Sequence, residues 1–250
     1  MFRMKFIGLG LLVFFNNVNA VLLEGQIIDD STHDFIGPFP PEVCDDGLIT
    51  ATHYSYGFEN GLNGWDTDAL VGWNTWVQSS VSTHTGLKSM LVTDINQIGD
   101  QILTSPVISL PENQAPLTLQ FWHQQFIEAG TTVCYDGAIL EISTNNGQSF
   151  IQISDDKMLS NPYDGPIAIS EGNPLATRDA WCGDPQDWFN SIVDLNTYEG
   201  QNVVFRFRLG TDNSVDREGW YIDDVKIQSC VLLENDIIFL GGFEELLNKT

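Results

Sequence analysis

Hydrophobic and polar residues alternate in short runs along most of this chain, and helical periodicity is nearly absent after residue 20. Alternation with a period of two is typical of strands, and the clusters of Gly, Asn, Pro and Asp between the runs are typical of turns. The pattern predicts strands over residues 53–59, 74–81, 88–95, 100–108, 117–126, 138–145, 149–154, 190–195, 202–210 and 219–227. Short strands at this spacing predict an all-β fold, an antiparallel jelly-roll β-sandwich.

The same pattern divides the chain into four parts. Residues 1–20 combine a basic start, an apolar run of ten residues and small residues before Ala20, which is the pattern of a secretory signal peptide. Residues 21–47 form an N-terminal lead-in segment, residues 48–230 the jelly-roll domain and residues 231–250 a C-terminal tail. No later apolar run is long enough to span a bilayer, so we expect a secreted protein, extracellular or at the cell surface, without a membrane span.

Two stretches inside the domain depart from simple alternation. Residues 143–150, STNNGQSF, are the clearest hairpin, because Asn-Gly supplies the positive-φ positions that a tight turn needs. Residues 155–189 are rich in Pro, Gly and Asp and predict a long surface excursion.

Four cysteines, Cys44, Cys134, Cys182 and Cys230, are spread along the chain without a C-x-x-C pair. In an exported protein this usage favours disulfides over zinc, although four cysteines allow three pairings. We favour Cys44 with Cys230, which brackets the domain, and Cys134 with Cys182, which joins two loop-like segments.

The chain is strongly acidic, with 34 Asp and Glu against 10 Lys and Arg and a net charge of -24. Nucleic acids and anionic membranes bind basic surfaces, so the charge argues against both as partners. The charge is compatible with bound cations and equally with an acidic surface that serves solubility alone.

Residues 219–227, GWYIDDVKI, read as a strand with two adjacent carboxylates in its middle. Alternation places Asp223 on the face of Tyr221 and Val225, which we expect to be the core face, and leaves Asp224 on the solvent face. A carboxylate buried alone costs several kcal/mol or becomes protonated, so Asp223 needs a cation or a set of hydrogen-bond donors.

Glu59 is the candidate partner of Asp223. It ends a predicted strand and enters a Gly-rich turn in the sequence FENGLNGW. If the first and last strands are neighbours, Glu59 and Asp223 meet, and two hard oxygen ligands with backbone carbonyls describe a structural Ca²⁺ site. The alternative is that both acids cap turns or pair with Arg206 or Arg208.

Seven segments together resemble the jelly-roll (MAM-like, choice-of-anchor J-like) module of bacterial exoproteins. The segments are FENGLNGW, THTGLKSM, TSPVISLP, DGAILEISTNNGQSF, NPLATRDAWCG, VDLNTYEGQNVVFRFRLGTD and GWYIDDVKI. The module occurs in the C-terminal regions of M6-type metallopeptidases resembling immune inhibitor A, and alone as surface domains related to MAM domains. The resemblance covers about residues 48–230 and implies that Glu59 and Asp223 are calcium ligands. There is no H-E-x-x-H sequence, so it does not imply peptidase activity.

Residues 236–244, DIIFLGGFE, resemble a short tail at the C-termini of many secreted proteins of gammaproteobacteria. Six further residues follow the glutamate, which departs from the usual terminal position. A disordered acidic tail is the alternative interpretation.

Catalytic motifs are scarce in the sequence. There is no G-x-S-x-G, the four histidines do not have the spacing of a metal site, and Glu141 has no partner acid at alternating spacing on its strand. We therefore predict no catalytic residues. Tryptophans in a loop can stack against sugar rings, and Trp181 and Trp188, with Tyr163, are our candidates in the long excursion.

The sequence as a whole predicts a secreted, calcium-stabilised module that binds a carbohydrate or a protein surface, with adhesion as the broader role. One alternative is a polysaccharide hydrolase on a concanavalin-like sandwich, which requires two carboxylates at glycosidase spacing on a concave sheet. Another is a structural subunit of an envelope or extracellular assembly.

Overall fold

The computed structural model describes residues 27–28, 35–36, 44, 48–169 and 172–232. The expected signal peptide, most of the lead-in segment and the acidic tail from residue 233 lie outside the described residues. The chain divides into two units, Met1–Glu42 and Val43–Thr250. In the first unit, β1 (Ile27–Ile28) and β2 (Phe35–Ile36) pair antiparallel. Among the described residues, no helix is long and apolar enough to cross a membrane.

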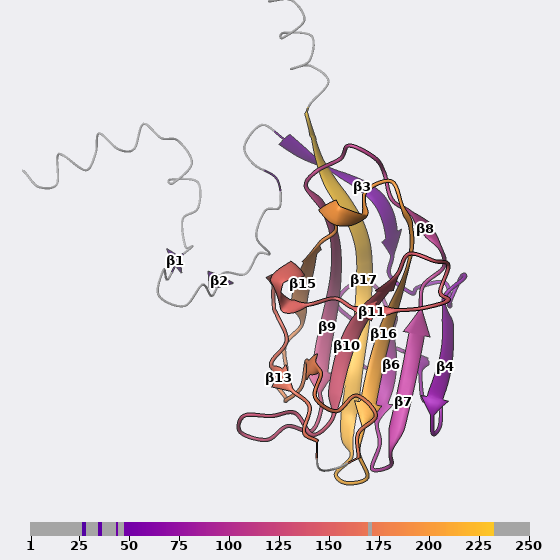
Figure 1. The fold of residues 1–250 in the computed structure, drawn as a ribbon, viewed down its shortest axis with the longest axis vertical. Coiled ribbons are helices and arrows are strands. Elements are labelled where there is room, and N and C mark those ends of the chain that lie inside the picture. The colour runs from indigo at the N-terminus through magenta and orange to yellow at the C-terminus, as the bar shows by residue number, and fades with distance from the viewer. Residues whose placement is uncertain (1–26, 29–34, 37–43, 45–47, 170–171, 233–250) are drawn as a thin grey trace, which may run out of the picture. The chain divides into compact units, whose positions relative to one another are not determined.

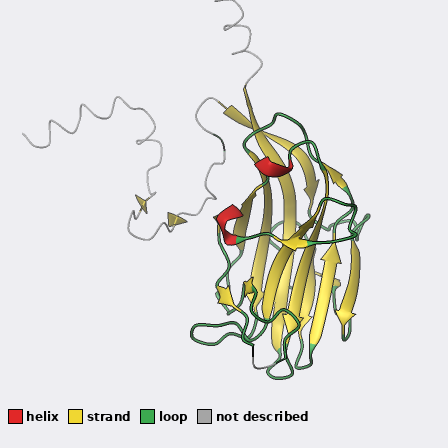
Figure 2. Cartoon of the chain, viewed as in Figure 1, coloured by secondary structure: helices red, strands yellow, loops and turns green. Residues whose placement is uncertain are grey.

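The second unit is an antiparallel β-sandwich, an all-β jelly roll whose two sheets face each other (Figure 1, Figure 2). The larger sheet has seven strands in the order β12-β15-β9-β17-β6-β5, with β3 also paired to β17. The smaller sheet has six strands in the order β11-β10-β16-β7-β4, with β8 also paired to β16. The fold predicted from the alternating pattern is therefore confirmed.

The strands of the larger sheet are β3 (Leu48–Tyr56), β5 (Val77–Ser79), β6 (Ser89–Asp94), β9 (Leu117–Phe126), β12 (Met158–Ser160), β15 (Phe189–Asp194) and β17 (Arg217–Leu232). Those of the smaller sheet are β4 (Asp66–Val71), β7 (Gly99–Thr104), β8 (Ile108–Ser109), β10 (Gly137–Ser143), β11 (Ile151–Gln152) and β16 (Asn202–Thr211). Each range predicted as a strand overlaps an observed strand. The predicted hairpin joins β10 to β11, with positive φ at Asn146 (57°) and Gly147 (79°).

The excursion over residues 155–189 is more ordered than its composition predicts. It begins with the single-turn helix η3 (Asp155–Lys157) and contains β12 and the small antiparallel pair of β13 (Gly165–Pro166) and β14 (Asp179–Ala180). A second short helix, η4 (Asn196–Tyr198), precedes β16. The excursion thus returns to the sandwich and closes one side of its core.

Aromatic side chains from both sheets fill the space between them. Phe121 of β9 and Phe207 of β16 meet edge to face with ring centroids 5.0 Å apart, and Trp220 of β17 lies 5.8 Å from Phe207. All three side chains are fully buried. Burial of a large apolar side chain contributes about 1.5 to 3 kcal/mol, so this layer is a main source of stability.

His123 belongs to this core and not to a catalytic site. Its Nδ1 accepts a hydrogen bond from the Trp220 indole at 3.1 Å, and its Nε2 lies 2.9 Å from the Ser191 hydroxyl. Burial lowers the pKa of His123 to about 3. The ring is therefore neutral, with its proton on Nε2, because an indole N–H cannot donate to a protonated nitrogen.

Both disulfides join the pairs that the sequence favoured. Cys44 is bonded to Cys230 near the C-terminal end of β17, and Cys134 is bonded to Cys182. The sequence separation of the joined cysteines is 186 for the first disulfide and 48 for the second. The described part of the chain contains no free cysteine.

Candidate functional site

A single loop, residues 82–88, which leads into β6, gathers the acids predicted to hold calcium. Asp223 is fully buried, and its Oδ2 accepts hydrogen bonds from the backbone N–H groups of His84 (3.0 Å) and Thr85 (3.2 Å). Glu59 is exposed, and its Oε1 accepts from the backbone N–H groups of Leu87 and Lys88, both at 2.9 Å. Glu59 and Asp223 therefore anchor adjacent parts of the same loop.

A β-bulge in β17 places a third carboxylate on this loop. Asp224 has a φ of 46°, and the pairing with β9 shifts register between Asp223 and Lys226. The bulge reverses the alternation, since Ile222 before it and Val225 after it both face the core although they are three residues apart. Assigning alternate residues to opposite faces of the sheet therefore fails across the bulge.

The predicted orientations of both acids were therefore wrong. Asp223 lies on the outer face of the larger sheet, beneath the 82–88 loop, and not between the sheets. Asp224 does not face solvent: its Oδ2 accepts from the Thr85 hydroxyl and from His84 Nδ1, both at 2.7 Å. The physical reason is the bulge, which turns two consecutive side chains toward one loop.

Three carboxylates on one loop create an excess of negative charge. Burial, together with the charge of Asp224, raises the pKa of Asp223 to about 6. Gly86 has a φ of 66°, and a Cβ atom at this position would overlap the Glu59 carboxylate. The positive φ thus favours glycine at this position, and a larger residue would displace the Glu59 carboxylate. A cation would offset the negative charge of the site.

Aromatic rings lie beside the 82–88 loop on the outer face of the larger sheet. The His84 ring stacks on Trp122 of β9 with centroids 3.8 Å apart and an interplanar angle of 11°. Trp188 is half-buried, lies 6.0 Å from the His84 ring and donates a hydrogen bond to the Ser82 hydroxyl. Tyr221 lies 6.3 Å from Trp188. Trp188 therefore remains a candidate for ligand contact.

The structure does not support the other two aromatic candidates. Trp181 is 2% exposed, packs against Phe121 and Trp220, and donates its indole N–H to the Asn161 carbonyl. Tyr163 is also buried, and its hydroxyl donates to the Ile153 carbonyl at 3.0 Å. Both were predicted at a ligand surface, and both instead fill the core, because the excursion folds back over it.

A network of ion pairs covers the outer face of the smaller sheet. Glu141 of β10 is bonded to Arg178 (2.7 Å), Arg206 (2.5 Å) and Arg208 (3.0 Å), and Arg208 also binds Asp100 (2.6 Å). Arg206 and Arg208 thus pair here and not with the two predicted metal ligands. Burial alone would raise the pKa of Glu141, but the hydrogen bond from Arg178 and the charges of the other two arginines hold it below its ordinary value. An acid held ionised in this way is unsuited to donate a proton in glycoside hydrolysis.

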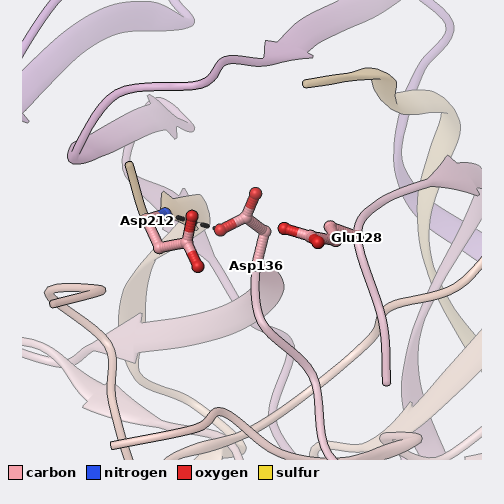
Figure 3. Close-up of side chains that lie close together, drawn as sticks. All are labelled: Glu128, Asp136 and Asp212. Carbon is pink, nitrogen blue, oxygen red and sulfur yellow. Dashed lines mark hydrogen bonds between the residues drawn. The ribbon is translucent and has the colours of Figure 1, made fainter. Parts of the chain in front are cut away.

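A second acidic group lies at the end of the sandwich where β16 turns into β17, and the sequence did not predict it. Glu128, Asp136 and Asp212 each offer a carboxylate oxygen, and these oxygens all lie within 4.8 Å of one another (Figure 3). Asp136 and Asp212 are fully buried, and Glu128 is partly buried. The buried Asp94 carboxyl lies within hydrogen-bonding reach of Asp136. We call these four residues the acidic cluster.

Burial and mutual repulsion disfavour ionisation of the acidic cluster. Burial first, and then the neighbouring Asp94 carboxyl, raise the pKa of Asp136 far above its ordinary value. Burial also raises the pKa of Asp94 and, with the charge of Asp212, that of Glu128. No other group of three His, Cys, Asp or Glu side chains in the described part of the chain approaches so closely.

Comparisons with known proteins leave the family open. No protein-family model matches the chain. Bacillopeptidase F of Bacillus subtilis (strain 168) is 33% identical over 84 residues, which is 32% of this chain and 6% of that protein. The chain therefore spans a small fraction of the length of this relative.

Several solved β-sandwich structures are similar. The K3 cleaved adhesin domain of Lys-gingipain from Porphyromonas gingivalis W83 is 22% identical, with a TM-score of 0.45, covering 71% of this chain and 98% of that one. TmCBM61 in complex with β-1,4-galactotriose is 14% identical, with a TM-score of 0.43, covering 68% and 92%. The CBM22-1 xylan-binding domain from Paenibacillus barcinonensis Xyn10C is 12% identical, with a TM-score of 0.41, covering 73% and 96%.

Proposed function

We propose that this protein is a secreted, calcium-stabilised binding module that recognises a carbohydrate or protein surface through the outer face of its larger sheet. The observation that carries the proposal is the position of Trp188. This half-buried ring lies beside His84, which stacks on Trp122 and belongs to the loop that three carboxylates anchor. A rigid aromatic surface with polar neighbours is the usual chemistry of a sugar-binding or protein-binding surface.

The two disulfides and the first 20 residues support an extracellular location, and the net charge limits the kind of partner. Disulfides persist in oxidising compartments, and the first 20 residues have the pattern of an export signal. A net charge of -24 opposes binding to nucleic acid and to anionic lipid. Asp184 and Asp187, both exposed, closely precede Trp188 in sequence, so a neutral or cationic ligand fits this surface better than an anionic one.

Calcium has a physical role at the 82–88 loop in this proposal. Glu59, Asp223 and Asp224 offer hard oxygen ligands. Asp223 and Asp224 both bind residues 84–85 of the loop, Glu59 binds Leu87 and Lys88, and none of the three forms an ion pair with a lysine or arginine among the described contacts. A bound Ca²⁺ would fix the loop and, through His84, the aromatic surface beside it.

Replacing Trp188 with alanine tests the binding surface. We expect Trp188→Ala to weaken binding by at least about tenfold, or about 1.4 kcal/mol, on a glycan or protein array that gives a signal with the wild type. Trp73→Ala is the matched control, because Trp73 is 69% exposed and outside this surface. Unchanged binding by Trp188→Ala, or an equal loss in both variants, would contradict the assignment.

Replacing Glu59 with glutamine tests calcium at the loop. The amide oxygen keeps an acceptor for the N–H groups of Leu87 and Lys88, so we expect the variant to fold but to bind one calcium ion fewer per chain in a calorimetric titration. The control is Glu112→Gln, which changes an exposed glutamate away from the loop. The same stoichiometry and affinity in Glu59→Gln as in the wild type would rule out this site.

A further inference from the structure

The acidic cluster brings together four segments that are far apart in the sequence. Asp94 ends β6, Glu128 follows β9, Asp136 precedes β10 and Asp212 follows β16. β6 and β9 belong to the larger sheet, and β10 and β16 belong to the smaller sheet. The cluster therefore connects the two layers of the sandwich at one end.

Three oxygen atoms in the cluster have no hydrogen-bond partner. Asp94 Oδ1, Asp136 Oδ2 and Asp212 Oδ2 are buried and unpaired, and their side chains are fully buried. An unsatisfied buried acceptor costs about 1 to 3 kcal/mol, and more when it is charged. Arg217 is the cation that acts on Asp94 and Glu128, but it is exposed and forms no ion pair that reaches them. When the carboxyls are ionised, no described side chain donates to these three oxygens.

Backbone groups hold the free oxygens in place. The partner oxygens are already used: Asp94 Oδ2 accepts from the Glu128 N–H, Asp136 Oδ1 accepts from the Asp212 N–H, and Asp212 Oδ1 accepts from the Ser214 N–H. Each of these three aspartates thus has one carboxylate oxygen bound to the backbone and one free. Figure 3 shows the Asp136 carboxylate between those of Asp212 and Glu128. This arrangement fixes the ligands before any ion arrives.

We propose that Asp94, Glu128, Asp136 and Asp212 form a binding site for a hard divalent cation, Ca²⁺, that joins the two sheets at this end of the sandwich. The donors are all carboxylate oxygens, which suit Ca²⁺ and Mg²⁺, whereas zinc and copper sites use imidazole or thiolate. Ca²⁺ fits better than Mg²⁺, because four protein carboxylates leave little room for the water shell that Mg²⁺ retains. The site is separate from the one proposed at Glu59 and does not depend on it.

The site would act together with a covalent link on the same segment. The Cys134–Cys182 disulfide lies two residues before Asp136 and ties that loop to the excursion. The ion would hold the other side of the loop to the turns after β6 and β16. Removal of the ion is therefore expected to loosen the connection between the sheets and leave the disulfide intact.

Calcium titration of Asp136→Asn in the Glu59→Gln background tests the proposal. In this background the loop site is removed, so calcium binding at the acidic cluster is measured by itself. We expect Glu59→Gln to bind one calcium ion at the cluster, and the double variant to lose it or bind at least about tenfold more weakly. At a hundredfold excess of calcium over the dissociation constant, the thermal midpoint of Glu59→Gln should rise by about 5 to 10 °C, and that of the double variant should not. In chelator, Asp136→Asn should melt close to the wild-type midpoint, because burial and the neighbouring carboxyls already disfavour the charged form of Asp136.

Asp164→Asn is the control, since Asp164 is a carboxylate whose Oδ2 is already bonded to Gln125 and Cys182. It should leave the calcium response unchanged. If Asp136→Asn raises the midpoint in chelator but removes no calcium, protons and not a cation occupy the cluster, and the proposal is wrong. A normal response in Asp136→Asn together with a lost ion in Glu59→Gln would overturn this inference and leave the loop site standing. A lost ion in Asp136→Asn together with unchanged calcium binding in Glu59→Gln would overturn the loop site alone.

Discussion

Replacing Cys44 and Cys230 together with alanine is expected to lower the free energy of unfolding by about 5 kcal/mol. The disulfide closes a loop with a sequence separation of 186, which takes in nearly the whole sandwich. The loss comes mainly from the unfolded chain, which gains conformational freedom when the link is absent. Guanidinium denaturation of the wild type and the double variant, with free thiols checked in each, measures the difference.

The second disulfide provides the comparison for this result. Cys134 and Cys182 close a loop with a sequence separation of 48, so the same estimate gives about 4 kcal/mol for the double alanine variant. Cys134 is fully buried, and its removal adds a packing loss that Cys44, which is only partly buried, does not. A cost below about 1 kcal/mol for the first pair would show that β3 and β17 hold together without the covalent link.

The strands were predictable where one face of the sheet is buried and the other is polar. β9 and β16 alternate clearly, and both occupy central positions in their sheets. β4 was missed because its sequence, DTDALV, places two aspartates on an edge strand that is mostly exposed. Edge strands receive little support from the core, so their hydrophobic pattern is weak.

Parity arguments failed at the acids of β17 for a definable reason. A single bulge residue, Asp224, reverses the face on which every later side chain lies. Ile222 before the bulge and Val225 after it both face the core, but nothing in the sequence marks the position at which the register changes. The loop that receives Asp223 and Asp224 lies about 140 residues earlier, as the sequence separations of the hydrogen bonds from His84 show.

Tertiary packing decided two other features that local patterns could not reveal. Trp181 lies in a Pro- and Gly-rich stretch, which predicts exposure, yet its backbone pairs with Ala138 and its ring completes the core. The acidic cluster consists of four single acids on four segments, so no spacing rule detects it. Asp136 and Asp212 become neighbours only when β10 pairs with β16, and Asp94 and Glu128 join them only when the two sheets stack.

Gly219→Ala is expected to destabilise the fold by at least about 4 kcal/mol, which is more than most single substitutions cost. Gly219 has a φ of 117°, and a Cβ there would overlap the Val92 carbonyl oxygen and lie 2.9 Å from the Asp94 backbone nitrogen. The colliding atoms belong to the backbone of β6, so no side chain can rotate away, and β6 must move from β17. Thermal and guanidinium denaturation measure the loss. Because Asp94 would move with β6, calcium binding at the acidic cluster should weaken as well.

Gly61→Ala separates the two causes of this effect. Gly61 also has a positive φ, 81°, but a Cβ there meets no atom within 4 Å. Its replacement should therefore cost only the backbone strain of about 1 to 2 kcal/mol. If Gly219→Ala costs no more than Gly61→Ala, the contact between β17 and β6 is not as close as the structure shows. If it costs far more and also weakens calcium binding, the same close contact both supports the sheet and positions Asp94.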